Sequence, residues 1–98
     1  MNAGGKPKLS DALKELLPLA AHWKTIGVLL GLSDEYPGKI ELIESNEKSV
    51  ENKLQAMLSE WLKTPMPQPT WNSLADAVEH VDHIKAELIR NSSVNDFS

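Results

Sequence analysis

One stretch of the sequence carries the clearest helical pattern in the chain: residues 49–62 read SVENKLQAMLSEWL. Apolar residues recur there at intervals of four, three and one positions, which places them on a single face of an α-helix. These residues are Val50, Leu54, Met57, Leu58, Trp61 and Leu62. Ser49 precedes them and is a preferred N-cap, because its hydroxyl can accept a hydrogen bond from a free amide of the first turn. The stretch predicts a helix with a wide apolar face, suited to the centre of a helical bundle.

A rigid connector follows this central helix. Residues 64–69 read TPMPQP, and three prolines in six residues cannot continue a helix. Thr70 is then an N-cap candidate for a further helix. The inward residues of that helix are Trp71, Leu74, Ala75 and Val78. A last short helix is expected after Asp82, and its inward residues are Ile84, Leu88 and Ile89.

The sequence before the central helix predicts two helices separated by a kink. The first has an apolar stripe formed by Leu9, Leu13, Leu16, Leu17 and Ala20. Pro18 interrupts this stripe, because its ring disfavours helical geometry at the preceding residue and removes an amide donor. A second helix is expected to start near Ala21, with Trp23, Ile26 and Leu30 inward. Gly31 then suits a left-handed C-terminal cap, and Leu32 is expected to pack beneath it.

A short helix is expected between this cap and the central helix. Residues 33–38 read SDEYPG, which combines an N-cap candidate with a turn. Ile40 and Ile43 form the inward pair of the short helix, which ends at residues 45–46. All these patterns together predict an all-α fold, a bundle of about six short helices. The three tryptophans fall on inward stripes and are expected to fill the core.

The length and composition place this bundle in a single folded domain. A chain of 98 residues is long enough for one core and too short for two. We expect the domain to span residues 9–90, between a flexible segment (residues 1–8) and a polar tail (residues 91–98). No apolar run approaches the roughly 20 residues that cross a bilayer. The absence of cysteine excludes disulfides and the usual structural zinc sites, which favours the cytoplasm.

Signals for catalysis are absent from the sequence. It contains no glycine-rich phosphate loop and no nucleophile elbow, so neither an enzyme nor a bound cofactor is expected. His80, His83 and Glu87 have spacings at which one helix face could hold a metal ion. The helix start expected at Asp82 would separate the two histidines, however. We therefore expect a polar, pH-sensitive corner there and no metal.

Charge is distributed unevenly along the chain, whose net charge is -4. Residues 34–51 contain six acids and two lysines, a local balance of -4, whereas residues 6–24 contain four lysines and two acids, a local balance of +2. An acidic surface and a more basic one can associate head to tail. The overall negative charge is unfavourable for binding nucleic acid. The charge pattern therefore favours a protein partner.

Four segments of the sequence stand out by their order and spacing. They are residues 23–32 (WKTIGVLLGL), the pair Ile40 and Ile43, residues 57–62 (MLSEWL) and residues 69–77 (PTWNSLADA). Together, between residues 9 and 90, they resemble the death domain family. The resemblance implies a six-helix antiparallel bundle with Greek-key topology and no catalytic activity. It also implies homotypic binding to other death domains or to itself, as an adaptor in oligomeric assemblies of apoptotic or innate-immune signalling.

The resemblance further implies which surfaces make the contact. In one common contact of the family, a surface of helices one and four meets a surface of helices two and three of a neighbour. The residues of this chain on the first surface would be Lys14, Glu15 and Glu60. Those on the second surface would be Lys24, Asp34, Glu35, Lys39, Glu41 and Glu44.

Several alternatives remain open at this point. The connector at residues 80–83 is shorter than in many death domains. The kink at Pro18 leaves the related caspase-recruitment branch open, while residues 85–88 (KAEL) lack the Arg-x-Asp-Leu that would favour the death-effector branch. A helix-turn-helix domain that binds nucleic acid is the alternative from another class, although the helix expected at residues 70–81 has two acids and no lysine or arginine. We expect the domain in the cytoplasm, free or as the intracellular part of a larger protein.

Overall fold

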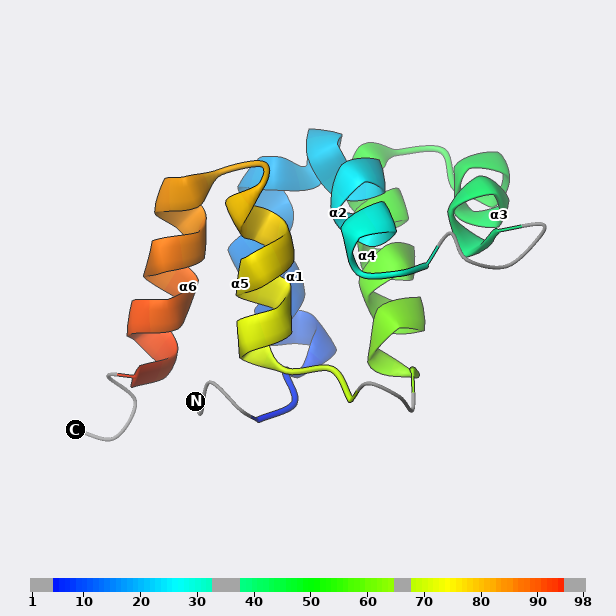
Figure 1. Ribbon diagram of the computed structural model, residues 1–98. Coiled ribbons are helices and arrows are strands. Elements are labelled where there is room, and N and C mark those ends of the chain that lie inside the picture. Colours follow the sequence, from blue (N-terminus) through cyan, green and yellow to red (C-terminus); the bar gives the residue numbers. More distant parts are fainter. Residues whose placement is uncertain (1–4, 33–37, 65–67, 95–98) are drawn as a thin grey trace.

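The computed structural model describes residues 5–32, 38–64 and 68–94 (Figure 1). Most of these residues are helical. These residues form six α-helices and one 3-10 helix and contain no strand. In chain order the elements are α1 (Leu9–Leu16), η1 (Leu17–His22), α2 (Trp23–Leu29), α3 (Lys39–Asn46), α4 (Val50–Leu62), α5 (Trp71–Glu79) and α6 (His83–Val94). The predicted all-α bundle is confirmed.

Helix α4 holds the centre of the bundle, as its apolar face predicts. It packs against α1, η1, α2 and α3, whereas α5 packs against α6 and more lightly against α2. The contacts of α1 and α2 with α4, and of α2 with α5, thus join helices that are separated in sequence. In Figure 1, α6 and α3 lie at opposite ends of the molecule, with the other helices between them. The surfaces of these two helices are therefore well separated.

The three tryptophans are core residues, which confirms the prediction. Trp23, Trp61 and Trp71 come from three different helices and are each no more than 4% exposed. A tryptophan buries roughly 150–250 Å² of mostly apolar surface. Replacing one of them by alanine would therefore cost about 3–5 kcal/mol of folding free energy. The three rings therefore contribute mainly to the packing of the core.

The helix starts agree with the caps expected from the sequence. The Ser49 hydroxyl accepts a hydrogen bond from the Asn52 amide at 3.1 Å, and α4 begins directly after it. Thr70 and Ser73 form a reciprocal capping box at the start of α5. The Asp82 carboxylate accepts a hydrogen bond from the Lys85 amide before α6. These caps fix where three helices begin.

The end of α2 has the left-handed cap that the sequence predicts. Gly31 has a φ of 90°. The amide of Gly31 donates to the Val28 carbonyl, and the amide of Leu32 donates to the Gly27 carbonyl, at 3.0 and 3.1 Å. This pair of bonds is a Schellman motif. Leu32 is buried beneath it, as expected.

The kink expected at Pro18 is present and changes the elements around it. Leu19 has non-helical backbone angles, and the chain from Leu17 to His22 forms η1. Helix α2 therefore begins at Trp23, two residues later than expected. The prediction that Leu17 faces inward is wrong, because the tighter turn starts there and leaves its side chain 44% exposed.

Helix α6 differs most from its predicted pattern. Ile84 and Leu88 are 68% and 54% exposed, so their inward placement is wrong, whereas Ile89 is buried as predicted. The inward face is instead formed by Ala86 and Ile89, since α5 is the main neighbour of α6 and covers only that side. The helix also continues to Val94, four residues beyond the boundary expected at residue 90.

The segment before α1 contacts the body of the domain. Within the expected flexible stretch, residues 5–8 are described, and the Gly5 carbonyl accepts a hydrogen bond from the Trp71 amide at 3.2 Å. Pro7 is buried. The Trp71 amide lies in the first turn of α5, where no carbonyl of the same helix can reach it. The segment thus supplies the missing acceptor.

Candidate protein-interaction surfaces

Helices α2 and α3 share a charged outer surface, which we call the α2–α3 surface and define by Lys24, Glu41 and Glu44. The Lys24 ammonium lies 3.3 Å from the Glu44 carboxylate, and both side chains are about half exposed. Glu41 is exposed and has no ion pair within the described residues. Three of the residues predicted for one face of the contact are thus brought together. Asp34 and Glu35, predicted for the same face, lie outside the described residues.

Close packing holds the two helices of this surface in place. At Gly27 in α2, an added Cβ would overlap Cδ1 of Ile40 in α3 and lie 3.0 Å from Cγ of Met57. The absence of a side chain at Gly27 therefore allows α3 to approach α2 directly. The buried Ile40 and Ile43 complete the contact from the α3 side. This packing positions the carboxylates of α3 beside Lys24.

Lys39 and Glu60 lie together in a groove between α3 and α4. This α3–α4 groove is lined by Lys39, Leu42, Ile43, Asn46, Ala56, Ser59, Glu60 and Lys63. Glu60 also lies 3.7 Å from the ammonium of Lys63. The sequence-based expectation placed Lys39 and Glu60 on opposite sides of a contact. In the structure they belong to the same surface.

Glu15 takes part in a contact within the domain. Its carboxylate lies 3.0 Å from the Lys85 ammonium, which joins α1 to α6. Both side chains are mostly buried, at 29% and 20% exposure. Lys14, next to Glu15, is exposed and has no ion pair within the described residues. Of the three residues predicted for the α1–α4 face, Lys14 is therefore the one best placed to meet a partner.

A cluster of charges joins α5 to α6, and the sequence reasoning did not identify it. Arg90 contacts Asp76 at 2.6 Å and Glu79 at 3.2 Å. His83 places one ring nitrogen 3.2 Å from Glu79 and the other 3.4 Å from Glu87. The regular spacing of residues 79, 83 and 87 was a visible signal. The contacts of Arg90 could not be found in this way, because they require the antiparallel packing of α5 against α6.

Arg90 changes the acidity of its partner. Its hydrogen bond and positive charge hold the pKa of Glu79 below the usual range of a glutamate, with a smaller effect from His83. Hydrogen bonds to Asp76 and Glu79 raise the pKa of Arg90 in turn. Both shifts favour the ionised forms of Glu79 and Arg90. The charges of the cluster are exposed, so its role is to orient α6 on α5 more than to stabilise the fold.

The histidines considered as metal ligands are separated by the turn between α5 and α6. His80 follows the last residue of α5, and His83 is the first residue of α6. His83 and Glu87 contact each other, while His80 lines a cleft. Across residues 5–32, 38–64 and 68–94, no group of three or more histidine, aspartate or glutamate side chains is placed to hold a metal ion.

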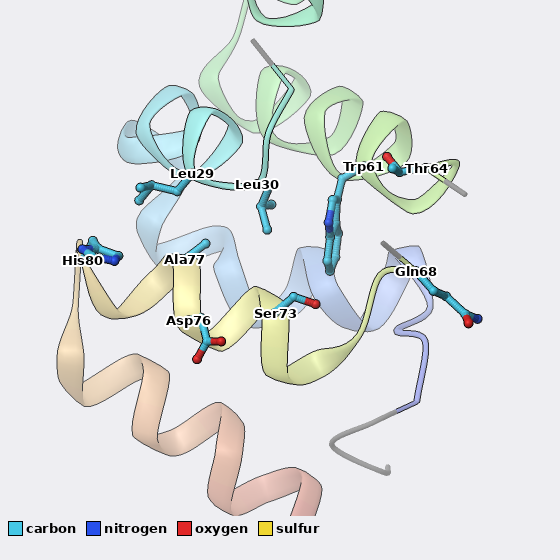
Figure 2. Close-up of a pocket in the computed structure, with 9 residues that line it drawn as sticks. All are labelled: Leu29, Leu30, Trp61, Thr64, Gln68, Ser73, Asp76, Ala77 and His80. Atoms are coloured by element: carbon cyan, nitrogen blue, oxygen red, sulfur yellow. The ribbon is translucent and has the colours of Figure 1, made fainter. Parts of the chain in front are cut away.

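A cleft opens between α2, α4 and α5, and we call it the α2–α5 cleft (Figure 2). Its volume is about 280 Å³. The lining residues are Leu29, Leu30, Trp61, Thr64, Gln68, Ser73, Asp76, Ala77 and His80. Figure 2 shows Leu29 and His80 at one end, Thr64 and Gln68 at the other, and the Trp61 ring between them. The residues form an apolar floor with a polar rim, an arrangement suited to binding.

Comparison with known proteins gives one result. The model of the death domain family matches residues 6–93. Neither the curated proteins nor the solved structures contain a match to the chain. Within the described residues, no helix is long and apolar enough to cross a membrane. The family match extends over nearly the whole chain and agrees with the all-helical bundle, its buried tryptophans and its caps. The chain belongs to the death domain family.

Proposed function

We infer that this domain is a non-catalytic module that binds other death domains, or further copies of itself, through surfaces of opposite charge. Membership of the family supports protein-protein interaction in death-domain signalling. The observation that carries the specific proposal is the separation of Lys14 on α1 from the acids Glu41 and Glu44 on α3. A basic surface and an acidic surface on one molecule allow each copy to bind the next in the same way.

Such a contact is heterologous, because two different surfaces of the domain meet. Heterologous contacts generate rings when the rotation closes and open helical filaments when it does not. Recruitment into an oligomer of this kind suits an adaptor in apoptotic or innate-immune signalling in the cytoplasm. Lys14 would face Glu41 of a neighbour, with Lys24 and Glu44 beside it. The α3–α4 groove, with Lys39 and Glu60, would lie at the border of this contact.

The helix that would read nucleic acid in a helix-turn-helix domain has unsuitable charges. Helix α5 carries the exposed acids Asp76 and Glu79 and no lysine or arginine. Specific recognition in the major groove requires donors from basic and amide side chains on such a helix. The charges of α5 therefore support a protein partner over a nucleic acid.

Charge reversal tests the proposed contact. We expect Glu41→Lys to raise the dissociation constant, for self-association or for binding to another death domain, by at least about tenfold, or about 1.4 kcal/mol. Lys14→Glu should have the same effect. Mixing the two single variants should restore association between unlike copies, because each contact between position 14 of one copy and position 41 of the other then pairs a lysine with a glutamate. Sedimentation velocity over a range of concentrations measures these constants.

Glu87→Lys is the matched control, since it makes the same change of charge on α6, at the end of the molecule away from α3. It should leave association unchanged. Equal weakening by Glu41→Lys and Glu87→Lys would show that only net charge matters and would refute the specific contact. Unchanged binding by both Glu41→Lys and Lys14→Glu would refute it as well.

A further inference from the structure

The α2–α5 cleft has an apolar floor and an exposed apolar edge. Trp61 and Ala77 form its floor and are almost completely buried. Leu29 forms the edge and is 43% exposed, and the adjacent Val28 is 47% exposed. Exposed large apolar side chains that adjoin an apolar hollow are typical of protein-interaction sites. This apolar face contains neither Lys14 nor Glu41 of the proposed function, and it borders the α2–α3 surface at the Lys24–Glu44 pair.

The size of the cleft suits a protein side chain better than a small-molecule ligand. Its volume of about 280 Å³ lies below the roughly 300–1,000 Å³ of small-molecule sites. Its rim is also open. A partner that inserts one or two apolar side chains would fill such a hollow and bury Leu29 at the same time.

The projecting residues and the hollow lie next to each other on one face, which makes the face self-complementary. A two-fold symmetric dimer requires this property, because the same patch of both copies must fit against itself. In such a dimer, Leu29 of each copy enters the mouth of the partner's cleft. Thr25, exposed between Lys24 and Leu29 on α2, lies near the centre of the contact.

The charges at the two borders of this face are complementary as well. On the α2 side, Lys24 is paired with Glu44, and on the α5 side, Asp76 is paired with Arg90. Lys24 and Asp76 are about half and 72% exposed, so each can still face a partner. A two-fold axis brings Lys24 of one copy towards Asp76 of the other. The two existing pairs then join into a chain of alternating charges, which occurs twice by symmetry.

We propose that the face formed by α2 and the α2–α5 cleft is an isologous dimerisation surface that binds a second copy of this chain, with Leu29 of each copy in the cleft of the other. The proposal deepens the proposed function, on which it rests, by adding a symmetric contact to the heterologous one.

Substitution of Leu29 tests the dimer directly. Sedimentation velocity of the full chain carrying Glu41→Lys, which removes the heterologous contact, should show a monomer-dimer equilibrium over a concentration series, and the variants below are made in this background. Leu29→Asp should raise the dimer dissociation constant by at least tenfold, because a carboxylate would enter an apolar cleft. Leu88→Asp is the matched control, since Leu88 is similarly exposed but lies on the outer side of α6. Circular dichroism should show equal helix content in both variants, because neither leucine is part of the core.

A charge exchange tests the orientation of the two copies. Lys24→Asp and Asp76→Lys should each weaken the dimer several-fold, whereas the double variant should recover most of the wild-type dimer. Recovery is expected only if the two positions face each other across the contact. A double variant weaker than both single variants would overturn the proposed geometry.

The results also separate this proposal from the heterologous contact. A chain that is monomeric at all concentrations, or a dimer that Leu29→Asp does not weaken, would overturn the dimerisation surface. Association lost in Glu41→Lys but retained in Leu29→Asp would overturn it and leave the proposed function intact. A Leu29-dependent dimer that binds through neither Lys14 nor Glu41 would support the surface and refute the charge contact.

Discussion

Gly31 shows how a single residue fixes the end of a helix and the course of the chain after it. Among the described residues it alone has a positive φ, of 90°, and its amide and that of Leu32 complete the cap of α2. A residue with a Cβ meets its own carbonyl in this conformation. The cap therefore depends on the identity of this residue, although Gly31 itself is exposed.

We expect Gly31→Ala to lower the free energy of unfolding by about 1–2 kcal/mol, because alanine is strained at this φ. Urea denaturation followed by circular dichroism measures the change. Gly38→Ala is the matched control, since Gly38 has a φ of -63°, which any residue adopts without strain. A larger loss in the control than in Gly31→Ala would contradict the role of the left-handed cap.

Local signals of this kind were predictable from the sequence. Each helix cap involves a hydrogen bond to the backbone amide three residues later, as at Ser49, Thr70 and Asp82. Both partners therefore lie within one short stretch of sequence, where the pattern can be recognised. The charged residues of the candidate surfaces were less predictable. Glu15 and Lys85 are separated by 70 positions, and only the fold shows that they pair. The role predicted for Glu15 in an interaction surface stays a prediction, and the structure adds its ion pair with Lys85 within the domain.

Helix α6 illustrates what a pattern cannot decide at the scale of an element. Ile84 and Leu88 form one apolar stripe, while Ala86 and Ile89 form another. Helical periodicity fits both, and the choice depends on which side α5 covers. The sequence-based prediction favoured the side of Ile84 and Leu88, whereas the structure buries the side of Ala86 and Ile89. The fold does not explain why α6 has large apolar side chains at the exposed positions Ile84 and Leu88.

The charge cluster between α5 and α6 makes a testable prediction about acidity. Arg90→Met should raise the pKa of Glu79 towards its usual range, because the hydrogen bond and the positive charge are lost. A lowered pKa in the folded state means that Glu79 contributes stability above its unfolded pKa and loses it as the pH falls through the folded pKa. In Arg90→Met, the free energy of unfolding should therefore fall less steeply as the pH drops through the range in which Glu79 titrates.

Titration of the Glu79 carboxyl by NMR measures the pKa in both proteins. Lys63→Met is the control, because it removes a cation that lies beside Glu60 on α4. It should leave the pKa of Glu79 unchanged. An unchanged pKa in Arg90→Met would contradict the assignment of the shift to Arg90.

For the whole molecule, the sequence predicted the class of fold and the family more reliably than the surfaces. The order of apolar stripes and caps along the chain was sufficient for the bundle. Surfaces depend on which helices become neighbours, and this explains why Lys39 and Glu60 were assigned to opposite faces although both line the α3–α4 groove. Residues that line a groove come from elements whose relative placement no local pattern encodes.

The separation of charge over the molecule predicts a strong effect of salt. Raising sodium chloride from about 0.05 M to about 0.5 M shortens the Debye length from above 10 Å to below 5 Å. We expect association through Lys14 and Glu41 to weaken by roughly tenfold over this range. Light scattering at fixed protein concentration measures the loss of mass. Association that is unchanged or stronger at high salt would contradict a charge-based contact.

The contacts of the N-terminal segment have a consequence for the time course of folding. The Gly5 carbonyl bonds to the Trp71 amide, and Glu15 pairs with Lys85, so the beginning of the chain is joined to its last two helices. A ribosome adds Lys85 70 residues after Glu15, so this pair can form only after the intervening helices have been made. The apolar face of α1 packs mainly against α4 and can be covered once α4 has emerged, whereas its ion pair with Lys85 must wait for α6. The hydrogen bond of Gly5 and the ion pair of Glu15 are therefore among the last contacts of the domain to form.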